Sequence, residues 1–214
     1  RDTEAILNHP EDNGPLILVG KTDERKYQGA TQVFIYAKDA PNLFAATVAA
    51  LSQLNLTIAD AKIITSSSSF TLDTYIIMEE NGSSVEDEDR IEQITQKLRD
   101  TLSDPTRFPE VVHKRLPRAL KHFRVVTEIT LSNDLDHKCT VIEVITLDRP
   151  GLLAEIGRIF MEAGALLQNA RIATFGERAE DVFYITDIHG EMIRDPELCA
   201  ALAKSLRERL DKPA

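Results

Sequence analysis

An internal duplication constrains this chain more than any other feature of its sequence. The duplicated segments are Val33–Leu43 with Ile142–Leu152 and Ile58–Thr65 with Leu167–Thr174, each pair 109 positions apart. The offset becomes 108 where Asp73 aligns with Asp181. A slip of one residue between two extended runs is typical of a hairpin turn, where loop length changes at little cost. The duplication predicts two small domains of one kind, or two halves of a paired unit.

Composition narrows the class of protein. The chain has 214 residues, 43% hydrophobic and 28% charged, as in ordinary soluble domains. No apolar run approaches the roughly 20 residues that cross a bilayer, so we expect no membrane partner. The formal net charge of −10 repels phosphate backbones, so we expect no nucleic-acid partner. Cys139 and Cys199 are expected to be reduced thiols of a cytoplasmic protein rather than a disulfide.

The first copy shows the pattern of a ferredoxin-like module. Strand-like runs at 32–38, 56–65 and 70–79 alternate with helical stripes over 42–54 and after Asp87. A proline-containing linker and a strand at 123–131 would complete the order β-α-β-β-α-β. This α+β order predicts an antiparallel sheet with helices on one face. We expect a linker over 1–30 with a possible strand at 16–21, a first module over 31–131 and a second over 139–214.

The second copy repeats the order but ends without a closing strand. Its elements are expected at 140–147, 151–163, 165–174, 181–188 and 195–210. An unpaired sheet edge is usually covered, so we expect Leu16–Lys21 or a neighbouring chain to fill it. The run Val33–Tyr36 is apolar on both faces, which indicates that the open face of the sheet meets another sheet or a partner.

A candidate ligand site lies in the turn of the second copy. Asp148, Pro150, Gly151 and Leu152 join a strand to a helix start, where free N–H groups and the helix dipole favour a carboxylate. Gly151 allows close approach to the main chain, and Asp148 can cap the helix or hold an ammonium group. The alternative is that this is only a good strand-to-helix turn.

Two further polar residues strengthen the site hypothesis. Gln168 and Asn169 begin a strand among small and apolar neighbours, and side-chain amides suit the polar head of an amino acid. The alternative is a satisfied turn at a strand entrance. The first copy is predicted to be the weaker site, with Asp39 and Asp60 as its matching residues and Asn42 in place of Gly151.

The sequence contains no recognisable catalytic or cofactor motif. Phosphate-binding glycine loops, nucleophile elbows and paired cysteines are absent. The five histidines show no metal-like spacing. We therefore expect no catalytic residue, no metal site and no cofactor within this segment.

The fold order and the Asp-x-Pro-Gly-Leu turn resemble the ACT domain, a regulatory module that binds amino acids at interfaces between copies. The resemblance covers about residues 31–214 and implies a ligand at Asp148, Pro150, Gly151, Leu152 and Asn169. Asp39 and Asp60 are the corresponding positions of the first copy.

Longer strings resemble the tandem ACT region of bacterial bifunctional uridylyltransferase/uridylyl-removing enzymes. They are Leu116–Phe123, Leu147–Ala154 and Gly176–Phe183. The resemblance implies a glutamine-sensing tail, with the PII signalling protein as the target of the parent enzyme. It also implies upstream catalytic domains that use magnesium and UTP. A stand-alone tandem-ACT regulator and a docking scaffold remain alternatives, and pairing within one chain or in a homodimer stays open.

Overall fold

The computed structural model describes residues 2–9, 14–22, 30–40, 42–65, 69–104 and 125–211. Its elements in chain order are α1 (Asp2–Leu7), β1 (Leu16–Lys21), β2 (Thr31–Lys38), α2 (Leu43–Gln53), β3 (Leu56–Thr65), β4 (Phe70–Glu79), α3 (Glu88–Ser103), β5 (Glu128–Asp134), β6 (Cys139–Leu147), α4 (Leu152–Glu162), β7 (Leu166–Phe175), β8 (Arg178–Thr186) and α5 (Pro196–Leu210). The string 116–123, which contributes to the resemblance, lies outside the described residues.

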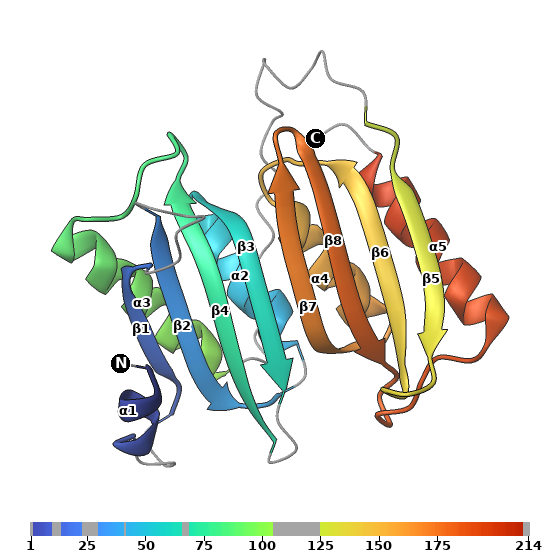
Figure 1. The fold of residues 1–214 in the computed structure, drawn as a ribbon, viewed down its shortest axis with the longest axis horizontal. Coiled ribbons are helices and arrows are strands. Elements are labelled where there is room, and N and C mark those ends of the chain that lie inside the picture. The colour runs from blue at the N-terminus through green and yellow to red at the C-terminus, as the bar shows by residue number, and fades with distance from the viewer. Residues whose placement is uncertain are drawn as a thin grey trace.

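The strands form one eight-stranded sheet in the order β1-β2-β4-β3-β7-β8-β6-β5, with neighbouring strands antiparallel. Helices α2 to α5 all cover the same face of the sheet (Figure 1). The first four strands with α2 and α3 form one module, and the last four with α4 and α5 form the other. The prediction of two ferredoxin-like α+β modules is confirmed.

The predicted strand pairings at the two edges were wrong. The strand expected to close the first module, β5, instead pairs with β6 of the second, from Glu128 opposite Ile145 to Asp134 opposite Cys139. A short turn makes this pairing local, and the Asp134 carboxylate accepts hydrogen bonds from the N–H groups of Asp136 and His137, each 3.0 Å. A hairpin closes with less loop entropy than a crossover to a distant edge, so β5 joins its sequence neighbour.

The same reason corrects the prediction for Leu16–Lys21. This strand, β1, pairs with β2 of the first module rather than with the second, with Leu16 opposite Tyr36 and Lys21 opposite Thr31. Its Ile17 joins the buried core beneath the helices. Each module therefore has the chain order β-β-α-β-β-α, and its edge strand is the first strand of the module. In the described part of the chain, no strand follows α5.

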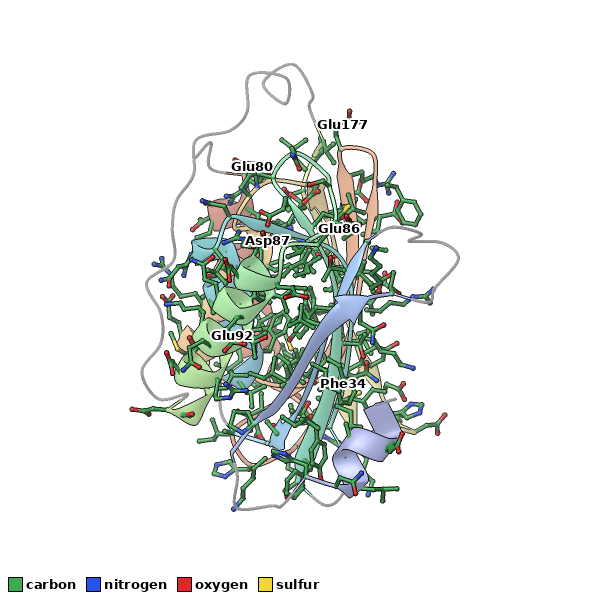
Figure 2. The ribbon with its side chains drawn as sticks, turned by 90° about the vertical axis from the view of Figure 1, so that its left-hand side faces the viewer. Phe34, Glu80, Glu86, Asp87, Glu92 and Glu177 are labelled. Carbon is green, nitrogen blue, oxygen red and sulfur yellow. The ribbon has the colours of Figure 1, made fainter. Side chains whose placement is uncertain are left out.

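Strand β2 carries large apolar side chains on both faces of the sheet, as the sequence predicted. Val33 and Ile35 belong to the core on the helix side, whereas Phe34 lies between them on the other face of the sheet and is still only 6% exposed. Figure 2 shows the molecule from the β1 edge, with α3 on one side of the sheet and Phe34 labelled. Tyr36 and Phe70 stack nearby, with ring centroids 5.0 Å apart. That another sheet or a partner meets this face stays a prediction.

The two modules meet through β3 and β7 with local two-fold symmetry. Lys62 lies opposite Arg171, its own counterpart 109 positions later, and the pairs on either side are related in the same way. Each strand also has a bulge at an equivalent residue, Ala59 in β3 and Gln168 in β7. The copies therefore associate as the two subunits of a symmetric dimer would, but within one chain.

Helices α2 and α4 cross closely above this strand pair. A Cβ added to Gly157 of α4 would lie 2.8 Å from the Cα of Ala45 and 2.9 Å from its Cβ. Backbone on both sides leaves no flexible side chain to move aside. The absence of a side chain at Gly157 thus sets how near the two modules can approach.

We expect the substitution Gly157→Ala to destabilise the protein. Overpacking typically costs about 1–3 kcal/mol, against a gain of about 1 kcal/mol when alanine replaces glycine in a helix. Urea denaturation should show a lower free energy of unfolding, and Gly157→Val should lower it further. Equal or greater stability in Gly157→Ala would show that α2 and α4 do not cross at this distance.

Candidate ligand-binding sites

Equivalent turns position the candidate residues of the two modules. The N–H of Asp39 donates to the carbonyl of Ser69 at 2.8 Å, and the N–H of Asp148 donates to that of Glu177 at 2.9 Å. Each turn is thereby tied to the neighbouring hairpin of its own module. Figure 2 shows Glu80 and Glu177, from different modules, at the same end of the molecule.

Both turns enter their helices through a residue in the left-handed region. Gly151 has φ 80° before α4, and Asn42 has φ 69° before α2. Asparagine tolerates this conformation better than most residues. The first copy has Asn42 where the second has Gly151, and both residues give the turn the same backbone shape. The asparagine, which made the first copy the weaker site in the sequence analysis, therefore does not change the turn.

Each turn faces the start of a strand from the other module, and a cavity lies between them. The first, here named the Asp73 cavity, has a volume of about 110 Å³. Its polar lining comes from Asp39, Asn42, Thr65, Thr71, Asp73 and Gln168. The second, the Arg149 cavity, has about 220 Å³, and its lining includes Ser52, Asn55, Thr57, Glu80, Asp148, Arg149, Pro150, Gly151 and Leu152. Both cavities are composite, because neither module lines one alone.

The structure divides the predicted site residues between these cavities. Gln168 lies with Asp39 in the Asp73 cavity, not with Gly151 as the sequence suggested. The reason is the antiparallel pairing of β3 with β7, which brings the start of each strand to the helix entrance of the opposite module. The sequence predicted one hollow lined by Gly151 together with Gln168 and Asn169. The structure instead has two separate cavities, one with Gln168 and one with Gly151.

The β7 bulge separates Gln168 from Asn169. Because Gln168 is the extra residue in β7, its side chain lines the cavity, and its Nε2 donates to Thr186 Oγ1 at 3.3 Å. Asn169 is exposed and lines neither cavity. Asp60, its counterpart in β3, also lines neither. Bulges commonly change the direction in which the neighbouring side chains point. The sequence pattern did not predict this bulge, because an extra residue in a strand leaves the residue types unchanged.

Asp73 is the most deeply buried acid of the first cavity. It is 0% exposed, its Oδ1 accepts a hydrogen bond from the Thr71 hydroxyl, and its Oδ2 accepts one from the Tyr75 hydroxyl at 3.4 Å. Burial raises the pKa of Asp73 to about 7; the two hydroxyls oppose that shift and the neighbouring Asp39 carboxylate adds to it. Burial also raises the pKa of Asp39.

Asp181 occupies the equivalent position in the second module. It is 1% exposed, its Oδ1 accepts from the N–H of Ala173 at 3.3 Å, and its Oδ2 has no partner among the described residues. Burial raises the pKa of Asp181 to about 7, and Asp148 adds to the shift while the Ala173 N–H opposes it. Unlike Asp73, Asp181 does not line the cavity of its own module's turn.

The Arg149 cavity contains a cation and an unpartnered hydroxyl. Arg149 Nη2 donates to the carbonyl of Arg209 at 3.4 Å, and its Nε has no partner in the described part of the chain. Burial lowers the pKa of Arg149, and Glu155 opposes the shift. Across the cavity Ser52 is 7% exposed, with an Oγ that is likewise unpartnered within the described ranges. Both groups can donate to a ligand oxygen.

Sequence reasoning missed Asp73, Asp181 and Ser52 as candidate residues. A signal for the aspartates was present, because an acidic residue stands at the same place in both copies, within a strand-like run. Charges at core positions are rarely retained without a role or a partner. Ser52 left no such signal, because it contributes to the cavity only through the crossing of α2 over the other module.

Among the described residues, no three histidine, cysteine or acidic side chains gather as metal ligands do. The described helices include none with the length and apolar character needed to cross a membrane.

The buried aspartates predict an unusual pH dependence of stability. A carboxyl whose pKa is near 7 in the folded protein and 3.8 in the unfolded chain binds more protons when folded, so its stabilising effect is lost as the pH rises from about 4 to 7. In urea denaturation, Asp181→Asn should therefore gain stability relative to the wild-type chain between pH 5 and pH 8, by on the order of a few kcal/mol. A difference between the two proteins that does not change with pH would contradict this.

Comparison with known proteins identifies the family of this chain. The ACT domain model matches residues 140–198, which is the second copy. The bifunctional uridylyltransferase/uridylyl-removing enzyme of Ectopseudomonas mendocina is 51% identical over 213 residues, covering 99% of this chain and 24% of that protein. The enzyme of the same name from Azotobacter vinelandii is 51% identical over 209 residues, covering 97% and 23%.

A solved aspartate kinase from Synechocystis aligns with a TM-score of 0.46 at 14% identity, over 87% of this chain and 27% of the kinase. The chain spans about a quarter of the curated relatives that it matches. Over nearly its whole length it is a homologue of that portion of the bifunctional uridylyltransferase/uridylyl-removing enzymes, and it carries an ACT domain.

Proposed function

We propose that this chain is the amino-acid-sensing part of a bifunctional enzyme that adds uridylyl groups to the PII nitrogen-regulatory protein and removes them. The observation that carries the proposal is the pair of composite cavities, each built from a helix entrance of one module and a strand start of the other. A ligand there touches both modules, so its affinity depends on how they are arranged.

Such coupling requires little energy. A tenfold shift between two activities corresponds to about 1.4 kcal/mol of differential binding. A net hydrogen bond contributes about 0.5–1.5 kcal/mol, so a few contacts made in only one arrangement suffice. Helix entrances at Asn42 and Gly151 would receive a ligand carboxylate, with Asp39 and Asp148 beside them.

We propose L-glutamine as the ligand, because Gln168 supplies an amide to one cavity and Asn55 to the other. Chemistry in the longer protein would belong to upstream domains that use UTP and magnesium, in the cytoplasm. The described residues show the two modules paired within one chain. Further pairing between chains as a homodimer is part of the proposal.

Calorimetric titration of the chain with L-glutamine tests the sensing role. We expect saturable binding in the wild-type chain and about tenfold weaker binding in Gln168→Ala, which loses one ligand-facing amide. Asn169→Ala is the matched control, because the adjacent side chain is exposed and outside both cavities, and its affinity should stay unchanged.

Two results would count against the proposal. No heat and no thermal shift at millimolar glutamine would remove the sensor role from this segment. Equal losses of affinity in Gln168→Ala and Asn169→Ala would mean that the ligand binds elsewhere. A docking scaffold would instead bind its partner equally well with and without glutamine.

A further inference from the structure

The internal duplication offers a control experiment within one chain. Around the buried aspartates, three first-module residues carry hydroxyl groups: Thr47, Thr71 and Tyr75. The equivalent second-module residues are Ile156, Ala179 and Phe183. All six side chains are buried. Because apolar residues fill the same positions of the second copy, the fold does not require the hydroxyls, and their presence in the first module points to a function there.

These hydroxyls organise the floor of the Asp73 cavity. Thr71 and Tyr75 donate to the two oxygens of Asp73, and Thr47 lies within hydrogen-bonding range of Tyr75 on the α2 side. Thr71 and Asp73 both line the cavity. In the second module Asp181 lacks such donors and does not line its cavity. Asp73 therefore lines the composite cavity beside the turn of its own module, whereas Asp181 lines a separate cavity with Arg171 and Glu180.

The charges of the two cavities also differ. The described lining of the Asp73 cavity holds the carboxylates of Asp39 and Asp73 but no lysine, arginine or histidine. Asp39 and Asp73 are close enough to repel each other. The Arg149 cavity instead contains a guanidinium beside its acidic residues. A cation is the natural occupant of the first cavity, and an anionic group can be accommodated in the second.

We propose that the Asp73 cavity binds the ammonium group of its ligand between Asp39 and Asp73, and that the two cavities are therefore not equivalent sites. This proposal rests on the amino-acid-binding function proposed above. It assigns ammonium recognition to Asp73, a strand residue, in addition to Asp39 of the turn. Arg149 and Ser52 give the other cavity a different preference, for the carboxylate end of a ligand.

Ammonium binding should displace the proton from those Asp73 carboxyl groups that carry one. With a pKa of about 7, Asp73 is partly protonated at neutral pH, and a cation beside it favours the ionised form. The titratable groups that face Asp73 are Asp39 from the turn and Tyr75 from the same strand. Helix α2 contributes Thr47, which is not titratable and contacts Tyr75 rather than Asp73. From β3 the backbone of Ile64 contributes a hydrogen bond. The affinity should therefore fall as the pH drops below 7, by up to about tenfold per pH unit.

The test is calorimetric titration of the whole chain with L-glutamine at pH 7, in phosphate and in Tris buffer, so that the difference in heat counts protons. The wild-type chain should release about half a proton per ligand bound in the Asp73 cavity. Asp73→Asn should release none and bind at least about tenfold more weakly there. Asp181→Asn is the matched control, because it removes the equivalent buried carboxylate outside the cavity, and it should behave like the wild-type chain.

Two probes separate the charged ends of the ligand. The monocation 4-aminobutanamide lacks the carboxylate of glutamine and should bind the wild-type chain and Asp181→Asn but not Asp73→Asn. Glutaramate lacks the ammonium group and should bind without proton release. Asp39→Asn, at the exposed mouth of the cavity, gives a second variant whose folding is not at risk, and it should also weaken binding of 4-aminobutanamide.

The outcomes separate this proposal from the function on which it rests. Glutamine binding without proton release, or with equal effects of Asp73→Asn and Asp181→Asn, would overturn the ammonium assignment and leave the sensor role standing. An affinity for 4-aminobutanamide that is unchanged in both Asp39→Asn and Asp73→Asn would also overturn it. Absence of any glutamine binding to the wild-type chain would overturn both.

Discussion

The antiparallel pairing of β3 with β7 is the contact on which the rest of the molecule depends. It joins two four-stranded halves into one sheet, and its symmetry, with Lys62 opposite Arg171, fixes where every other element of the interface lies. Helices α2 and α4 can pack above it only because Gly157 leaves room for the backbone of Ala45. Both composite cavities form at the ends of this contact, where a strand start meets a helix entrance.

Symmetry of the backbone does not extend to the chemistry of the two sites. The turns share the same left-handed entry, at Asn42 and Gly151, so the two cavities have a common frame. Within that frame the first copy has hydroxyls around its buried aspartate, and the second has a guanidinium at the turn. The two copies therefore differ in the side chains around their cavities while they keep the same backbone at the turn.

Much of the fold was predictable, since apolar periodicity reflects burial directly. The helix over Leu43–Gln53 and the strand over Leu56–Thr65 lie close to where their patterns placed them. Edge strands were assigned to the wrong modules, because β1 and β5 pair with the strand that follows each of them. Strand pairing is set by turn geometry and loop entropy, which a periodic pattern does not contain.

The sequence alone determined that two copies of one α+β module exist and that each has an acidic strand-to-helix turn. It also predicted that Asp148, Gly151 and Gln168 face a ligand. Those properties are local, since hydrophobic spacing and turn chemistry depend on near neighbours. Only the tertiary structure decided that Gln168 lies beside Asp39 rather than Gly151, that the β7 bulge leaves Asn169 exposed, and that Asp73 lines a cavity. These outcomes depend on which strand of one module meets which helix of the other, and residues more than a hundred positions apart meet only after both copies have folded and paired.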